Sequence, residues 1–222
     1  MPLFSAYMVL AQTKTLLVDE PLGADPVRIV KVMEGSTELK SDGQRYANKY
    51  AWEATFDARD DWLKDLSFDV KNVSDKTIVY LSTGCHLYET ADWQAEIAKH
   101  QSIPVLGHTV NAIGRRPEDA LYSPLLGHKL KPDTRARFQL APGEDFTINL
   151  EDPEDYEALK SSIEEKQPMS SAAACNAGIN QIFFEDGTQW HGHRYLREDP
   201  EHPGHWIAVS FKEWSSAAKA TE

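Results

Sequence analysis

The alternation of apolar and polar residues predicts that most of this chain forms β-strands. Runs in which every second residue is apolar are typical of strands with one buried face. In the first half of the chain such runs occupy residues 27–33, 52–56 and 66–70, and another β-rich run begins at residue 78. Asn72 to Lys76, between the last two runs, have the residue types of a tight turn. This stretch therefore predicts either a β-hairpin or a corner between two sheets.

The second half of the chain predicts one helix. In "EDPEDYEALKSSIEEKQP", Asp152 is a suitable N-cap, Pro153 suits the first helical position, and acidic residues fill the first turn. The apolar stripe is narrow and the rest of the surface is charged. We therefore expect a helix over residues 152–167 on the outside of a sheet.

Strands are expected on both sides of this helix. Residues 136–140 and 146–150 flank the turn dipeptide Pro142-Gly143. After a linker of small residues at 169–178, Asp186-Gly187 predicts a hairpin with a type I′ turn. A final strand is expected within residues 205–214.

The domain organisation that follows is simple. Residues 1–26 form an N-terminal segment that is either a signal remnant or an extra strand. Residues 27–214 form a single β-sandwich domain, in which residues 91–131 are irregular. Residues 215–222 form a frayed tail.

Three stretches resemble bacterial immunoglobulin-like β-sandwich proteins of uncharacterised function. They are "DVKNVSDKTIVYL", "LKPDTRARFQLAPGEDFTINL" and "IFFEDGTQW", within residues 66–206. The resemblance implies a mainly β fold, an immunoglobulin-like antiparallel β-sandwich with the helix at 152–167 on its periphery. These motifs are typical of a fold and indicate no reaction.

Composition excludes some classes of partner. The 222 residues are 41% hydrophobic and 26% charged, with a formal net charge of −12. A strongly acidic chain repels phosphate backbones and anionic membranes, so we expect no nucleic-acid partner. No apolar run reaches the roughly 20 residues that span a bilayer, so we expect no membrane insertion. A protein or glycan ligand is the partner that this composition favours.

The N-terminus and the cysteines bear on location. "MPLFSAYMVLAQTK" has an apolar stretch that resembles the end of a secretory signal but lacks a basic start. A secreted or periplasmic protein is expected, with a cytoplasmic one as the alternative. In an exported protein Cys85 and Cys175 could pair in a disulfide; the alternative is two buried free thiols.

Histidines near the C-terminus give the one candidate metal site. In a strand, His191 and His193 would share a face, and Glu198 follows five residues later. Imidazole and carboxylate ligands suit a divalent transition metal. The spacing resembles the first metal motif of cupin barrels, although too few residues follow for the second. A third ligand would come from Glu198 or from His86, His202 or His205; the alternative is a hairpin with polar surface histidines.

No other motif predicts catalysis. There is no nucleophile elbow, phosphate-binding loop or dinucleotide-binding loop, and the adjacent acids read as solvated charge. The six tryptophans favour core packing over a sugar platform. The sequence therefore favours a non-catalytic exported sandwich that binds or scaffolds a protein or glycan. The alternative is a metal-binding protein or metalloenzyme that uses His191 and His193.

Overall fold

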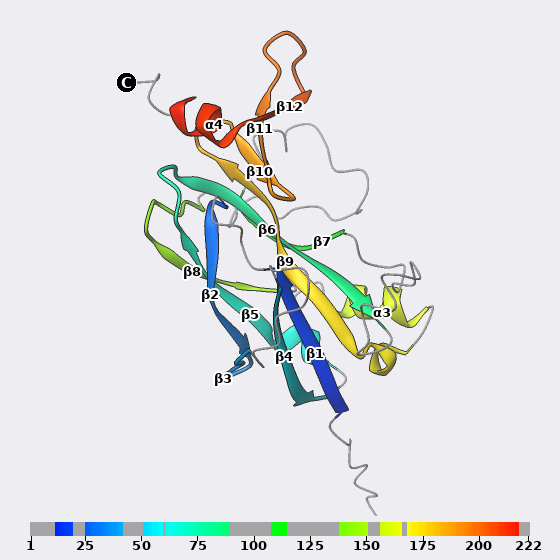
Figure 1. Ribbon diagram of the computed structural model, residues 1–222. Helices are drawn as coiled ribbons and strands as arrows, with labels where there is room; N and C mark the ends of the chain where they lie inside the picture. The colour runs from blue at the N-terminus through cyan, green and yellow to red at the C-terminus, as the bar shows by residue number, and fades with distance from the viewer. Residues whose placement is uncertain are drawn as a thin grey trace, which may run out of the picture.

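The computed structural model describes residues 12–19, 25–41, 51–59, 61–88, 108–114, 138–150, 156–165 and 168–217. Figure 1 shows that these residues are mainly β, with a few short helices. Among them, no helix is long and apolar enough to cross a bilayer.

Two sheets make up the fold. The larger sheet contains β1 (Gln12–Asp19), β4 (Ala51–Ala58), β6 (Ile78–Tyr88), β7 (His108–Gly114), β9 (Ala174–Phe184), β10 (Gln189–His191), β11 (Arg194–Glu198) and β12 (Trp206–Val209). The smaller sheet has the order β3 (Thr37–Glu38), β2 (Val27–Glu34), β5 (Leu66–Asn72) and β8 (Asp145–Asn149). The helices among the described residues are η1 (Trp62–Asp65), α3 (Tyr156–Glu164), η2 (Met169–Ser171) and α4 (Phe211–Ala217).

The two sheets enclose one core. Every second residue of β5 is buried, as the pattern at 66–70 predicted, and these side chains meet apolar residues of the larger sheet. Residues with no measurable exposure come from both sheets and include Leu16, Phe68, Ile148 and Ile182. The expectation of a β-rich sandwich is therefore confirmed.

Strand β9 organises the larger sheet. Along one edge it pairs with β6, and along the other it pairs first with β1 and then with β10. Its pairing with β1 is parallel, so the expectation of a wholly antiparallel sandwich is wrong. Residues 178–180 of β9 lie between the segments that pair with β1 and β10, which leaves a notch in the sheet at that edge.

The turn after β5 is a corner between the sheets, because β5 belongs to the smaller sheet and β6 to the larger. The amide of buried Asn72 holds it. Asn72 Nδ2 donates to the carbonyl oxygens of Lys76 and Leu140, both at 2.8 Å, and Oδ1 accepts from the backbone N–H and hydroxyl of Ser74. This one side chain therefore satisfies the backbone where the chain leaves one sheet for the other.

Two expectations for the C-terminal half are wrong. The small residues expected as a linker at 169–178 form η2 and the start of β9, because the backbone at Ala174 and Cys175 pairs with β1 along one edge and with β6 along the other. The final strand ends at Val209, and α4 replaces its expected continuation and the start of the expected tail. Ser210 and Glu213 form a capping box: Ser210 N–H donates to Glu213 Oε2 at 2.8 Å, and Glu213 N–H to Ser210 Oγ at 3.3 Å.

Other expected elements are present in part. The helix expected at 152–167 appears as α3, while its expected capping residues 152 and 153 lie outside the described residues. Within the N-terminal segment 1–26, residues 12–19 form β1. Within the irregular region expected at 91–131, residues 108–114 form β7.

Cys85 and Cys175 are buried free thiols, so the disulfide is not formed. They lie on neighbouring strands but not directly opposite each other, because Cys85 pairs with Ala177 and Leu87 pairs with Cys175. Such diagonal neighbours have Cα atoms about 7–8 Å apart, beyond the usual disulfide range of about 4.4–6.8 Å.

Candidate functional site

The four C-terminal histidines lie at the two ends of β11. His191 ends β10, and Gly192 and His193 form the two-residue turn that leads into β11. Both turn residues have positive φ, 54° for Gly192 and 64° for His193. The expectation that His191 and His193 share a face of one strand is therefore wrong.

The sequence at this turn explains its shape. A two-residue hairpin loop with positive φ at both positions matches the twist of the flanking strands. Gly192 adopts this conformation without steric cost. Histidine is among the few other residue types enriched there, although the conformation is uncommon for any side chain. The strand therefore ends at His191 and a turn begins, although the His-x-His motif predicted that the strand continued.

Glu198 lies at the far end of β11 from His193. Five strand residues span about 13–16 Å at about 3.3 Å per residue. Glu198 Oε1 accepts the backbone N–H of Gly204 at 2.7 Å, and His202 Nδ1 lies 2.9 Å from Asp199 Oδ2. In the described part of the chain, no three His, Cys, Asp or Glu residues are grouped to hold a metal ion.

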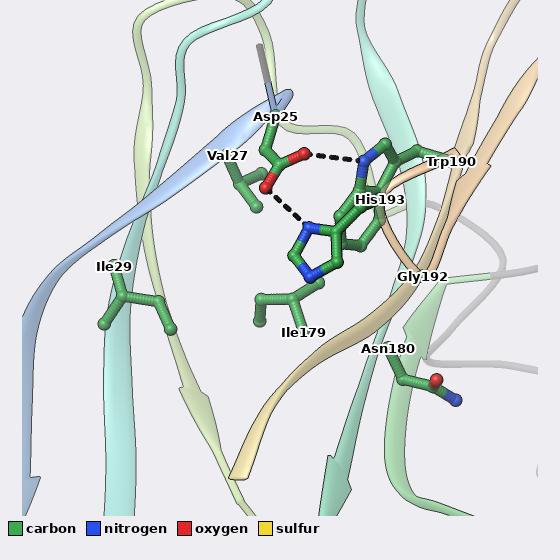
Figure 2. Close-up of a pocket in the computed structure, with 8 residues that line it drawn as sticks. All are labelled: Asp25, Val27, Ile29, Ile179, Asn180, Trp190, Gly192 and His193. Atoms are coloured by element: carbon green, nitrogen blue, oxygen red, sulfur yellow. Dashed lines mark hydrogen bonds and ion pairs between the residues drawn. The ribbon is translucent and has the colours of Figure 1, made fainter. Parts of the chain in front are cut away.

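His193 instead meets a residue from the other end of the sequence. Its Nδ1 lies 3.0 Å from Oδ2 of Asp25, and Oδ1 of Asp25 accepts the indole N–H of Trp190 at 3.1 Å. Figure 2 shows both contacts converging on the Asp25 carboxylate. The Asp25 side chain is 4% exposed and that of His193 is 40% exposed, so a buried carboxylate orients a partly exposed imidazole.

The contact with Asp25 limits the tautomers that His193 can adopt. An ionised carboxylate only accepts hydrogen bonds, so beside an ionised Asp25 the donor is Nδ1 of His193. In the neutral imidazole, Nε2 is then an acceptor. The same carboxylate acts on Tyr195: burial raises the pKa of that phenol well above its usual value, and the negative charge of Asp25 raises it further.

A cavity of about 120 Å³ opens beside His193. Val27 and Ile29 of β2 line one side, and Ile179 of β9 lines another. Figure 2 shows the second ring nitrogen of His193, Nε2, on the side of the ring away from Asp25, where Ile179 lies. Ile179 belongs to the notch in β9 between β1 and β10, so the cavity lies where the larger sheet is interrupted.

A second polar cluster, around Lys76, is structural. Lys76 Nζ lies 2.6 Å from Asp186 Oδ2 and 4.2 Å from the centre of the Trp214 ring. The hydroxyl of Thr188 donates to Asp186 Oδ1 at 2.6 Å and accepts the indole N–H of Trp214 at 3.0 Å. These contacts satisfy the buried groups and fasten α4 to the turn between β9 and β10.

That turn also differs from expectation. Gly187 has a φ of 79°, but Asp186 does not have positive φ. Gly187 N–H donates to the Phe184 carbonyl at 3.0 Å, and Phe184 N–H donates to the Thr188 carbonyl at 2.9 Å. The hairpin is therefore a type I turn followed by a left-handed glycine, not a type I′ turn.

The tryptophans whose side chains the structure describes serve mainly in packing. Trp62, Trp190 and Trp214 are buried, and Trp206 is half-buried with its ring 5.6 Å from that of Phe183. Trp93 and the side chain of Trp52 lie outside the described residues.

Comparison with known proteins adds no assignment: no protein-family model, curated protein or solved structure matches the chain. Sequence reasoning identified His193 but missed Asp25. Asp25 precedes the strand predicted at residues 27–33, and no local pattern relates it to residues 190–193. One signal was available: "WHGHR" places glycine where a tight hairpin turn needs it.

Proposed function

We propose that this protein is a non-catalytic β-sandwich that binds a protein or glycan ligand and receives one group of that ligand in the cavity beside His193. The size of the cavity carries this proposal. Sites for whole small molecules usually have volumes of about 300–1,000 Å³. The 120 Å³ here suits a single projecting group, with the rest of the ligand lying on the surface.

The construction of the site supports recognition. Asp25 and Trp190 hold the imidazole from one side, and the turn at Gly192-His193 fixes its backbone. A binding group that is already in place loses little conformational entropy when a ligand arrives. Conformations as uncommon as that of His193 also concentrate at ligand-binding sites.

The lining favours binding over catalysis. An imidazole oriented by a carboxylate acts as a base in many enzymes, usually next to a nucleophilic serine, threonine or cysteine. None of these residue types is among the described residues that line the cavity. We also propose an immunoglobulin-like fold, which the two facing sheets support. An exported location is proposed as well, and the apolar N-terminal stretch supports it.

A ligand screen by NMR tests this function. The full ¹⁵N-labelled chain is titrated with a panel of monosaccharides and blocked single amino acids, and amide shifts are followed. We expect at least one compound to shift the signals of Ile179, Gly192 and His193, and His193→Asn to abolish that response. Asparagine tolerates the positive φ of this position. His191→Ala is the matched control, because His191 lies outside the cavity lining. A panel in which no compound shifts these signals would refute the proposal.

A further inference from the structure

From the lining of the same cavity we infer that the group it receives is a primary alkylammonium, supplied by a lysine side chain of a protein partner. This inference rests on the proposed function and names the chemistry of the ligand. Three properties of the cavity carry it: its volume, the character of its walls and the charge behind His193.

The volume fits a lysine side chain. A protein cavity of about 150 Å³ holds benzene, which has six heavy atoms, so each atom takes about 25 Å³. At that ratio, the cavity of about 120 Å³ holds roughly five heavy atoms. A lysine side chain has four methylene carbons and one nitrogen. A pyranose ring with its hydroxyl groups, or an indole, is about twice that size.

The walls fit an aliphatic stem with a polar end. Val27, Ile29 and Ile179 give the cavity apolar walls, against which methylene groups pack favourably. The imidazole presents Nε2 on the side of the ring away from Asp25, beside Ile179, and Asn180 adds a polar amide to the lining. In the neutral ring Nε2 accepts a hydrogen bond, so a donor at the end of the stem is required.

Charge then selects the donor. The Asp25 carboxylate is one imidazole ring away from Nε2, so an ionised Asp25 beside a neutral ring makes the pair negative. It repels carboxylates and phosphates and attracts an ammonium, while a hydroxyl gains the hydrogen bond alone. The formal charge of −12 on the chain favours a basic partner in the same sense, through steering at long range.

Three probes with five heavy atoms each test this selection: n-butylammonium, 1-butanol and propionate. The full ¹⁵N-labelled chain is titrated with each at pH 8, where histidine side chains are ordinarily neutral. We expect n-butylammonium to shift the amides of Ile179, Gly192 and His193 with a Kd at least ten-fold lower than that of 1-butanol. Propionate should produce no shift. Equal or tighter binding of 1-butanol or propionate would overturn the inference but leave the binding function standing.

Variants place the effect at this site. Asp25→Asn removes the charge at almost constant shape, so n-butylammonium should bind at least ten-fold more weakly, with a smaller change for 1-butanol. Ile179→Phe fills the cavity and should abolish binding of both probes. His191→Ala should change neither. Unaltered amide dispersion in each variant confirms the fold. The site would be refuted if folded Ile179→Phe bound n-butylammonium as well as the parent does. It would also be refuted if the parent did not bind n-butylammonium.

The source of the ammonium is tested with Nα-acetyl-lysine N-methylamide and putrescine. The lysine derivative should bind at least as tightly as n-butylammonium, because its backbone lies outside the cavity and adds contacts. Putrescine should bind no more tightly, because its second ammonium remains in solvent. Binding of putrescine ten-fold tighter than the lysine derivative would overturn the protein partner in favour of a free polyamine.

Discussion

Asp25 and His193 are 168 residues apart in the sequence, yet their side chains are 3.0 Å apart in the fold. Asp25 lies just before the first strand of the smaller sheet, and His193 lies in a hairpin turn of the larger one. The contact therefore joins the two layers of the sandwich. Its consequences for stability differ from those of an exposed histidine, and they are measurable.

The first prediction separates the two neighbouring histidines. His193→Ala leaves one oxygen of buried Asp25 without its imidazole partner, and a buried group that loses its partner costs about 1–3 kcal/mol. His191→Ala removes an exposed side chain and should change the free energy of unfolding by no more than about 0.5 kcal/mol. Urea denaturation of both variants measures the difference. Equal destabilisation would show that the Asp25 contact contributes nothing.

A chelator tests whether His191 and His193 bind a metal ion. Metal binding to the native state adds its free energy to folding. With no described group of ligands at His191, His193 and Glu198, we expect the melting temperature of protein purified without a histidine tag to be the same with and without EDTA. A drop on adding EDTA that the double variant His191→Ala/His193→Ala does not show would support a metal site.

The second prediction concerns pH and Asp186. Burial raises the pKa of this carboxyl, but hydrogen bonds from Lys76 and Thr188 lower it by more, so the net pKa lies below its usual value. A lowered pKa stabilises the fold above the unfolded value of about 3.9, and this contribution is lost as pH falls through the folded value. Asp186→Asn should therefore be less stable than the parent at pH 7, by about 1–3 kcal/mol.

Measurements of unfolding free energy from pH 7 down to pH 3 check this prediction. The difference between parent and Asp186→Asn should begin to narrow once the pH falls below about 4, because the carboxyl of the unfolded parent then binds a proton while the folded carboxyl, with its lowered pKa, still does not. Glu185→Gln, an exposed neighbour, serves as the control. A difference that stays constant over this range would contradict the assignment to the Lys76 ion pair.

The third prediction concerns Gly187. Its φ of 79° is disfavoured for any β-branched residue, while a Cβ added there meets no atom within 4 Å. Gly187→Val should therefore destabilise the protein by about 1–3 kcal/mol through the backbone alone. Gly187→Asn, which tolerates this conformation, should cost less. Thermal melts of the two variants test the order; an equal loss in both would point to another cause.

The fourth prediction concerns the thiols. Cys85 and Cys175 are buried, and burial raises the pKa of Cys175, with the neighbouring Cys85 thiol raising it further. Only thiolates react readily. Native protein should therefore give no reaction with a thiol reagent, and protein denatured without reductant should give two thiols. Finding none after denaturation would show that the pair forms a disulfide despite its diagonal register.

Local sequence determined the strands whose two faces differ. Leu66, Phe68 and Val70 alternate with polar residues. Successive side chains of a strand point to opposite faces of the sheet, so only a strand with this face turned inward buries all three, and β5 could be predicted directly. The turn at Asn72 was predicted as well, because its residue types act on their own backbone neighbours. The local sequence does not predict which sheet the next strand joins, since that depends on partners distant in sequence.

Tertiary structure decided the rest. Residues 174–177 read as a linker until β1 and β6 are placed on either side of them, where their backbone completes the sheet. Asp25 and His193 likewise come into contact only when the two sheets pack together. A hydrogen bond depends on distance in space, and no periodicity in the chain encodes the meeting of residues from two sheets. The sequence by itself determined which residues are buried in alternating strands such as β5, and the packing of the two sheets decided which polar groups meet at the notch in β9.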